Sequence, residues 1–174
     1  LLIYSVLKGD STVLEKFTMT LPPAQLGTSY LNFIASHDGI GLRPVEGILN
    51  NKQTQSLISH IEEIGGKTSY RKSTDDIVKP YELNISLYDA VSKNFKGDEK
   101  YALERFLCIH TIMLSLEGVP AFYIHSLMGT QSDEKLSNKT QHNRDLNRHE
   151  YNEKELLDAL ENTNDYRSYI FNKI

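Results

Sequence analysis

The chain has 174 residues and a formal net charge of −4, with 39% hydrophobic and 24% charged residues. This composition is typical of a globular protein with one sizeable core and excludes a disordered chain. The mildly acidic balance argues against nucleic-acid binding, which needs clustered Lys and Arg, and no run approaches the ~18 apolar residues of a membrane span. The single cysteine, Cys108, excludes an internal disulfide and a multi-cysteine metal site. We therefore expect a cytoplasmic protein without nucleic-acid or membrane partners.

The first residues predict two short helices. An apolar run over residues 1–7 indicates the tail of an amphipathic helix, which Gly9 interrupts. The spacing of Thr12 and Glu15 matches a capping box, so a second helix is expected from near Ser11 to the prolines that follow Leu21. The sequence starts without a methionine and within this helical pattern, so we expect a fragment of a longer protein.

A short apolar run over residues 29–36 predicts a strand. It lacks polar alternation, which favours a strand buried on both faces, as in a parallel sheet. The run ends in His37 and Asp38, followed by Gly39 as a turn residue. A carboxylate at this point can hold sugar hydroxyls or offset positive charge in a transition state, or it can simply cap the turn.

Residues 40–84 have a different pattern. Apolar residues at helical spacing predict a helix over residues 53–64, which two glycines end. The polar stretch 67–78 is interpreted as a surface loop or a short hairpin, and the proline after Lys79 favours extended backbone.

The remainder is predicted to be mostly helical. Asp98 is a plausible N-cap for a long helix that is apolar almost all round and should be heavily buried. The expected elements are a helix over 85–92, this helix over 98–116, a buried strand over 121–124, a polar loop over 125–148, a helix over 152–160 opened by a capping box, and a last helix from about residue 164.

This order of elements is typical of an α/β fold with parallel strands. Polar residues follow both predicted strands, which is the arrangement expected at the active face of a (β/α)8 barrel.

Four segments, in order, resemble the sucrose phosphorylase branch of the α-amylase superfamily. Residues 32–41 are similar to its run SHDGIG and its surroundings, and residues 80–84 (PYELN) to its acceptor-side loop. Residues 118–127 resemble its eighth barrel strand and the loop after it, and residues 144–149 its R-x-I-N-R segment. The resemblance spans nearly the whole chain.

The resemblance implies an α/β fold that is part of a (β/α)8 TIM barrel, about strands 7 and 8 with their flanking helices. Residues 1–39 and 85–174 would be barrel, and residues 40–84 a small inserted subdomain carrying the acceptor-side loop. The implied activity is that of a glycosyltransferase, a retaining glycoside phosphorylase that moves glucose from an α-glucoside to inorganic phosphate. Phosphate would be a co-substrate, with no cofactor and no metal.

The resemblance also implies residue roles. Asp38 matches the carboxylate that stabilises the transition state, and His37 its neighbour that binds glucose hydroxyls. Arg144 matches an arginine beside the donor glucose, with Arg148 as an alternative or as an ion-pair residue.

The acceptor side is implied to involve Tyr81 and Glu82, and their segment is most similar to glucosylglycerate phosphorylases. Arg43 is a candidate for binding phosphate or a glycerate carboxylate, or for a structural ion pair. An acidic Glu82 beside an anion is unfavourable unless it binds hydroxyls or pairs with a base.

The nucleophile and the acid/base of this family have no counterpart in the chain, nor do the N-terminal barrel half and the C-terminal β domain. The fragment alone is therefore expected to be inactive. Two alternatives stay open: a hydrolase or transglucosylase of the same superfamily, and a truncated chain that binds sugar without catalysis.

Other candidate residues have simpler interpretations. His60 is expected at the surface or at a domain contact, His110 in the core, and His125 near the active side of the barrel. Cys108, between apolar neighbours, is expected to be inert core, and nothing suggests the convergent ligands of a zinc site.

Overall fold

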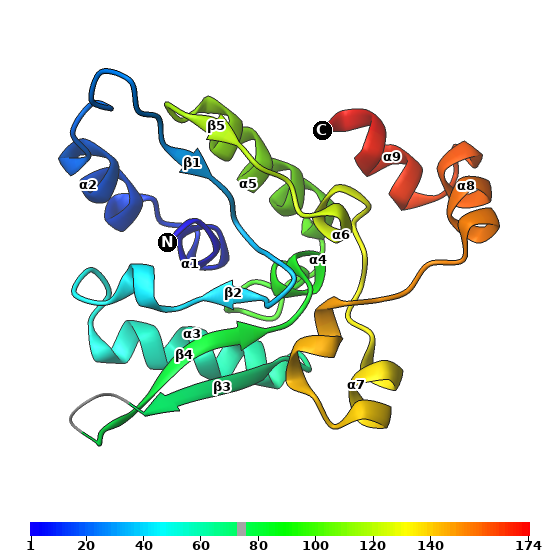
Figure 1. Ribbon diagram of the computed structural model, residues 1–174, viewed down its shortest axis with the longest axis horizontal. Helices are drawn as coiled ribbons and strands as arrows, with labels where there is room; N and C mark the ends of the chain where they lie inside the picture. The colour runs from blue at the N-terminus through cyan, green and yellow to red at the C-terminus, as the bar shows by residue number, and fades with distance from the viewer. Residues whose placement is uncertain (73–75) are drawn as a thin grey trace.

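The computed structural model describes residues 1–72 and 76–174. Two small sheets organise the chain (Figure 1): a parallel pair flanked by helices at the top of the view, and a three-stranded antiparallel sheet with its own helix below. Two further helices lie at the end of the molecule away from the antiparallel hairpin. The fold is α/β, as the sequence predicts.

The first two helices are α1 (Leu2–Lys8) and α2 (Thr12–Thr20). Gly9 ends α1 in the left-handed conformation (φ 69°), where its N–H bonds to the carbonyls of the last turn. The capping box predicted for α2 does not form. The N–H of Thr12 is bound by Asp10 instead, and Ser11 donates to Glu15.

The parallel pair is shorter than expected. β1 (Leu31–Asn32) runs parallel to β5 (Val119–Pro120). The predicted strand over 121–124 is wrong, because pairing begins two residues earlier and the chain turns into α6 (Ile124–Leu127). Backbone bonds from Val119 to Tyr30 and from Ala121 to Asn32, both 2.8 Å, extend the ladder slightly beyond the assigned strands.

Burial of β1 on both faces is not observed. Leu31 and Phe33 are 64% and 58% exposed, whereas the intervening Asn32 and Ile34 are half-buried. Side chains of a strand alternate between faces, so one face of β1 is covered and the other is not. The continuous apolar sequence shows that both faces are hydrophobic. It does not show which face other residues of the described chain cover.

Residues 40–84 form the antiparallel sheet, in the order β2-β4-β3, and the helix α3 that contacts it. A capping box between Asn50 and Gln53 starts α3, and the predicted glycines follow its end. Of the two interpretations of residues 67–78, the hairpin is correct, although residues 73–75 lie outside the described part. The bounds are β2 (Ile40–Gly41), η1 (Arg43–Val45), α3 (Asn51–Glu63), β3 (Lys67–Lys72) and β4 (Val78–Asn84).

The helix α4 (Leu87–Ala90) is shorter than predicted, and the long helix α5 (Ala102–Ser115) starts later than Asp98. Asp98 lies in the loop before α5, where its carboxylate accepts from Lys100 N–H at 2.8 Å and its carbonyl from Arg105. Only one face of α5 is buried, at the helical spacing of Phe106, Ile109, His110 and Met113. Its outer face is partly exposed, with Leu114 at 46%.

The predicted loop over residues 125–148 is wrong in part. It contains α7 (Glu134–Thr140), which Asp133 caps by accepting from the N–H of Leu136 at 2.8 Å, and η2 (Asn143–Asn147). The sequence did not predict α7, because this helix buries little apolar surface and therefore lacks apolar residues at helical spacing. The last two helices are confirmed as α8 (Glu153–Glu161), capped by Asn152, and α9 (Tyr166–Lys173), capped by Asp165.

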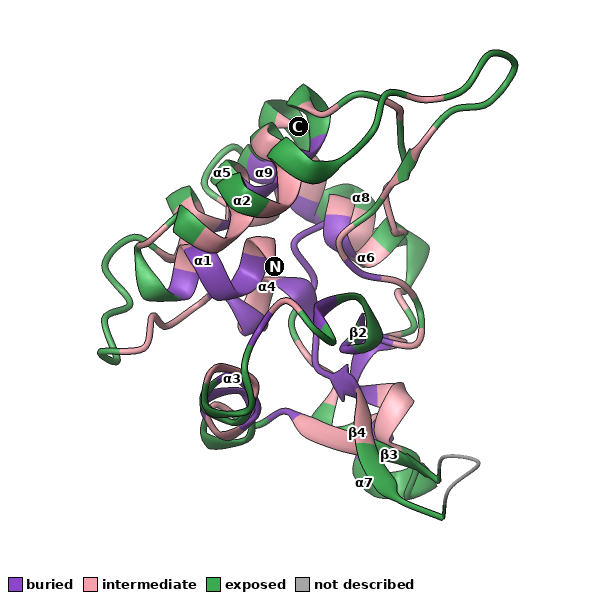
Figure 2. Cartoon of the chain, turned by 90° about the vertical axis from the view of Figure 1, so that its left-hand side faces the viewer, coloured by how far each residue is buried: buried purple, intermediate pink, exposed green. Residues whose placement is uncertain are grey.

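One apolar core joins the two sheets. Figure 2 shows buried residues concentrated in α1 and in the segments that connect β2 and β4 to the helices. Its largest fully buried side chains include Phe106, Ile61, Leu83 and Ile85. Within the described residues, no helix has the length and apolar character needed to cross a membrane.

Candidate active site

The turn after β1 presents His37 and Asp38. Ser36 and Gly39 exchange two backbone hydrogen bonds of 3.0 Å, which closes the turn around these two residues. Gly39 has φ +125°, and a Cβ there would overlap the carbonyl oxygen of Leu83 in β4. Glycine is therefore required both by the backbone conformation and by the close approach of β4.

Side chains from η2 and the residue after it hold the backbone of this turn. Asn147 Nδ2 donates to the carbonyl of Ser36, and Arg148 Nε donates to the carbonyl of His37 at 3.1 Å. Asn147 is 3% exposed. Neither contact was anticipated from the sequence, because the partners lie 111 residues apart.

Strand β4 holds the third carbonyl. Asn84 Nδ2 donates to the carbonyl of Asp38 at 2.9 Å, and Asn84 Oδ1 accepts from Ser69 Oγ of β3 at 2.6 Å. Asn84 is fully buried. Three successive carbonyls, those of Ser36, His37 and Asp38, are thus each bound by a side chain from a distant part of the chain, which fixes the turn relative to β4 and to η2.

The carboxylate of Asp38 lies between two guanidinium groups. Its Oδ1 is 3.1 Å from Arg144 Nη1, 3.1 Å from Arg148 Nη2 and 3.2 Å from His37 Nε2. Two guanidinium groups stabilise the negative charge of this oxygen. Within the described residues nothing bonds to Oδ2, so that oxygen is available to a ligand hydroxyl.

Arg144 joins Asp38 to β4. Its Nε and Nη2 donate to the two carboxylate oxygens of Glu82 at 3.2 and 3.1 Å, a bidentate pair, and Nη2 also donates to the Tyr81 hydroxyl at 2.6 Å. Five of the predicted site residues are therefore in one contact network: His37, Asp38, Tyr81, Glu82 and Arg144.

The ion pair with Arg144 explains how the acidic side chain of Glu82 is tolerated in the site. Glu82 is only 4% exposed, and Arg144 neutralises its charge while Asn84 donates to the same carboxylate. The hydrogen bond with Glu82 raises the pKa of Arg144 above its ordinary value, and a hydrogen bond with Glu82 also raises the pKa of Tyr81. The guanidinium therefore stays charged and the phenol stays protonated at neutral pH.

Arg43 lies apart from this network. Within the described residues, Arg43 forms no ion pair with Asp38 or Glu82. Its side chain lines a separate hollow that also includes Tyr81. Arg148 forms ion pairs, one of the two roles considered for it, since it lies 3.1 Å from Asp38 and 3.6 Å from Asp145.

The histidines outside the site are mostly structural. His110 is 2% exposed, and its Nδ1 lies 2.8 Å from the carbonyl of Phe106, which confirms a core histidine. His60 is buried rather than superficial, bound to the carbonyl of Lys93 at 3.0 Å. His125 contacts Thr130 at 3.1 Å, and burial lowers its pKa.

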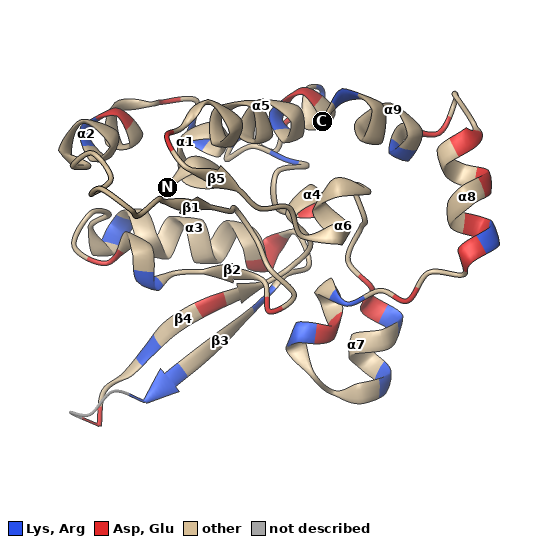
Figure 3. Cartoon of the chain, turned by 45° about the horizontal axis from the view of Figure 1, so that its top comes forward, with Lys and Arg blue, Asp and Glu red and all other residues tan. Residues whose placement is uncertain are grey.

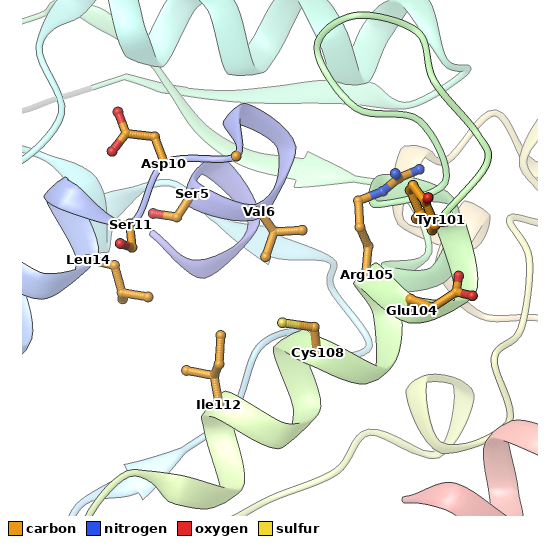
Figure 4. A pocket seen from close by; sticks show the side chains of 11 residues that line it. Ser5, Val6, Asp10, Ser11, Leu14, Tyr101, Glu104, Arg105, Cys108 and Ile112 are labelled. Carbon is orange, nitrogen blue, oxygen red and sulfur yellow. The ribbon is translucent and has the colours of Figure 1, made fainter.

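Cys108 is exposed, contrary to expectation. It lies on the outer face of α5 in a groove of about 480 Å³ between α5 and the first two helices, together with Val6, Leu14 and Ile112 (Figure 4). The flanking apolar residues Leu107 and Ile109 belong to other faces of the helix, so they do not cover the thiol. This groove contains none of the predicted site residues.

A metal site has no support in the described residues, where no three His, Cys, Asp or Glu side chains come together suitably. The network around Asp38 is instead a set of hydrogen-bond donors and acceptors at close range. Such a set suits a neutral, hydroxyl-rich ligand.

No family model matches the chain. The chain is 32% identical over all 174 residues to glucosylglycerate phosphorylase of Escherichia coli (strain K12), of which it covers 31%. It is 29% identical over 173 residues to sucrose phosphorylase of Agrobacterium vitis, a match over 92% of the chain and 32% of that protein. Homologues of this chain thus include glucosylglycerate and sucrose phosphorylases. As full-length proteins these homologues are glycoside phosphorylases, that is, glycosyltransferases.

The fold has a counterpart in a solved structure, sucrose 6F-phosphate phosphorylase from Thermoanaerobacter thermosaccharolyticum. The TM-score is 0.78 at 20% identity, over 99% of this chain and 34% of that one. The likeness confirms an α/β fold similar to that of this enzyme. The chain spans about a third of the length of the relatives it matches.

Proposed function

We propose that this chain is part of a retaining glycoside phosphorylase, which transfers glucose from an α-glucoside to inorganic phosphate and yields α-glucose 1-phosphate. The carrying observation is the contact network in which Arg144 joins Asp38 to Tyr81 and Glu82. These residues belong to segments more than forty residues apart, and the homologues of the chain are phosphorylases.

In this proposal β1 and β5 are neighbouring strands, the seventh and eighth, of a (β/α)8 barrel. Their parallel pairing, with Leu31 opposite Val119, and the placement of Asp38 after β1 support it, because active sites of such barrels lie at the carboxyl ends of the strands. Residues 40–84, with their own antiparallel sheet, are the inserted subdomain between barrel parts 1–39 and 85–174.

Asp38 stabilises the transition state. Arg144 and Arg148 fix Oδ1, which leaves Oδ2 to accept glucose hydroxyls. The hold on these hydroxyls strengthens as the ring flattens toward an oxocarbenium ion, so the contact favours the transition state over the ground state. His37, whose side chain is 66% exposed, offers a further hydrogen bond to the sugar.

Two other carboxyl groups complete the reaction, and we place them outside these 174 residues. One attacks the anomeric carbon while the other protonates the departing acceptor oxygen. A phosphate oxygen then attacks the same carbon and releases the nucleophile, so two inversions give net retention. By itself the chain is therefore inactive.

Glucosylglycerate is the α-glucoside favoured by the similarity to glucosylglycerate phosphorylases, and sucrose is the second choice. The test incubates the protein at its natural length with phosphate and each of glucosylglycerate, sucrose and sucrose 6′-phosphate, and assays α-glucose 1-phosphate. One substrate is expected to give product.

Asp38→Asn should reduce that product by about 10³-fold, a size common for the loss of one transition-state contact. The matched control is Asp158→Asn on the exposed side of α8, which should leave the rate unchanged. Free glucose formed without phosphate would identify a hydrolase instead. Absence of turnover with all three substrates would contradict the proposal.

A further inference from the structure

A second pair of ionisable side chains, Asp133 and His149, lies outside the contact network of Asp38. Asp133 Oδ2 and His149 Nδ1 are 2.7 Å apart, and the two side chains are 18% and 37% exposed. Figure 3 shows acidic and basic residues close together in this region, where α7 and η2 lie side by side. Within the described residues, neither side chain of the pair bonds directly to Asp38.

Asp133 is bound through all four of its polar atoms. At the start of α7, its carbonyl accepts from Ser137 N–H at 3.1 Å and its Oδ1 from Leu136 N–H at 2.8 Å. Its own N–H donates to the carbonyl of Leu146 at 2.8 Å, and its Oδ2 meets His149. Asp133 therefore joins α7 to the chain around η2 at two points.

These two points, residues 146 and 149, lie on either side of Asn147 and Arg148. The side chains of Asn147 and Arg148 bind the carbonyls of the turn that carries Asp38, and Arg148 also binds the Asp38 carboxylate. A side chain is held most accurately when hydrogen bonds from a further layer of residues fix its backbone and its rotamer. The contacts of Asp133 thus bear on the orientation of Asp38 without touching it.

The His149 ring is held on two sides. Burial disfavours the charged form of Asp133, but hydrogen bonds from Leu136 N–H and His149 outweigh this effect and lower the pKa of the carboxyl group. An ionised carboxylate only accepts, so His149 Nδ1 carries a proton and donates it to the bond. The ring also packs edge to face on Tyr151, with centroids 4.6 Å apart, and the Tyr151 hydroxyl lies 2.6 Å from Thr130 Oγ1.

We propose that Asp133 and His149 are a positioning pair for Asp38. By holding the chain on both sides of Asn147 and Arg148, they keep the Arg148 guanidinium on the Asp38 carboxylate. Loss of the pair lets Arg148 shift, and a misplacement of about 1 Å in a reacting group can cost about 100-fold in rate. The catalytic consequence rests on the proposed function, whereas the mechanical link between the pair and Asp38 does not.

The experiment measures kcat and KM of the protein at its natural length, with phosphate and the glucoside that gives product. His149→Leu removes the donor to Asp133. His149→Asn keeps a donor, because the amide nitrogen of Asn can take the place of Nδ1. His142→Leu is the matched control in the same segment, since His142 Nδ1 is 3.8 Å from Asp145, too far for a hydrogen bond.

His149→Leu should lower kcat by about 10- to 100-fold and change KM by less than about twofold, because the affected contact favours the transition state. His149→Asn should restore most of the rate, and His142→Leu should leave it unchanged. In an Arg148→Met background, His149→Leu should lower kcat by less than about threefold, because the pair acts through Arg148. A simple loss of folded protein would instead lower kcat by the same factor in both backgrounds.

Equal factors in the two backgrounds would therefore overturn the inference. A loss in His149→Asn or in His142→Leu as large as that in His149→Leu would do the same. Should His149→Leu not fold, Asp133→Asn replaces it in both backgrounds. That variant keeps an oxygen to cap α7 but presents an amide group to His149.

A natural protein that forms no product with any of the glucosides would refute the proposed function, and the link is then tested by thermal unfolding. The variants are His149→Leu, Asp38→Asn and the two combined. The double variant should shift the unfolding midpoint by less than the sum of the single shifts, because Arg148 then has only a neutral amide to hold. Single shifts that simply add would overturn the inference.

Discussion

Removal of the Arg144 guanidinium should destabilise the protein more than removal of the charge it neutralises. Arg144→Met keeps the apolar stem but leaves Glu82, 4% exposed, as a buried carboxylate. Its remaining partners in the described residues are neutral donors, Asn84 Nδ2 and the Tyr81 hydroxyl. A buried charge without a counter-charge is among the most costly single changes.

The magnitude follows from the exposure of the two partners. Breaking a buried ion pair costs ~3–5 kcal/mol of unfolding free energy, and the 31% exposure of the Arg144 side chain lets water replace part of the contact. We therefore expect about 3 kcal/mol for Arg144→Met. Glu82→Gln leaves Arg144 with Asp38 and Tyr81 and keeps an amide oxygen as acceptor, so about 1 kcal/mol is expected.

The double variant Arg144→Met/Glu82→Gln should be less destabilised than Arg144→Met alone, because no buried charge remains. Its expected cost is about 2 kcal/mol, where additivity would give about 4, so the two sites should be coupled by about 2 kcal/mol. Urea-induced unfolding of the four proteins at pH 7, followed by circular dichroism, measures these differences.

Arg167→Met provides the matched control. Arg167 pairs with Asp165 at 2.7 Å, but that carboxylate is more exposed, at 17%, so a cost of about 1 kcal/mol is expected. The reasoning fails if Glu82→Gln costs as much as Arg144→Met, or if the two single effects simply add. Either result would mean that Glu82 is solvated or neutral when Arg144 is removed.

Two further predictions concern the turn and the core. Gly39→Ala should lower the free energy of unfolding by about 3 kcal/mol or more, because the residue has positive φ and the new methyl group would overlap the Leu83 carbonyl. Thermal unfolding measures this loss. A loss of less than about 1 kcal/mol would show that the backbone of β4 moves aside at little cost. His110 has a pKa lowered from 6.5, chiefly by burial, so the folded state keeps it neutral while the unfolded state takes up a proton. The contribution of neutral His110 to stability should therefore be complete above pH 6.5 and be lost as the pH falls below that value. The variant His110→Gln should lose less thermal stability than the natural protein between about pH 7 and pH 5. If the two proteins lose the same stability over this range, His110 is not the source of the pH dependence.

Helices with clear local signals were predicted well, whereas α6 and α7, which have none, were missed. The apolar spacing over residues 53–64 and the caps at Asn152 and Gly9 lie within one or two turns, and each is found in the structure. Strands were predicted less well, since strand length depends on partners elsewhere in the chain. Residues 29–36 are apolar throughout, yet only Leu31 and Asn32 pair as a strand.

The candidate site was predicted through its chemistry-bearing residues, not through its supports. The resemblance selected six residues, of which the structure brings five into one contact network and leaves Arg43 apart: Asp38, His37, Arg144, Tyr81, Glu82 and Arg43. The supporting roles of Asn84 and Asn147 were not predicted, because no local sequence pattern distinguishes a buried asparagine from one in a turn. Their roles depend on contacts across 46 and 111 residues.

These supports make the position of Asp38 a property of the assembled protein. The turn that carries it is bound from β4 through Asn84 and from the chain after η2 through Arg148. Arg148 contacts both the backbone of His37 and the carboxylate of Asp38, so one guanidinium fixes the side chain relative to the turn. In the role proposed for Asp38, a carboxylate that is already oriented would lose little entropy on binding a sugar, so its hydrogen bonds would be retained for the transition state. Under that proposal the segment SHDG supplies the carboxylate, and the two distant elements determine its position.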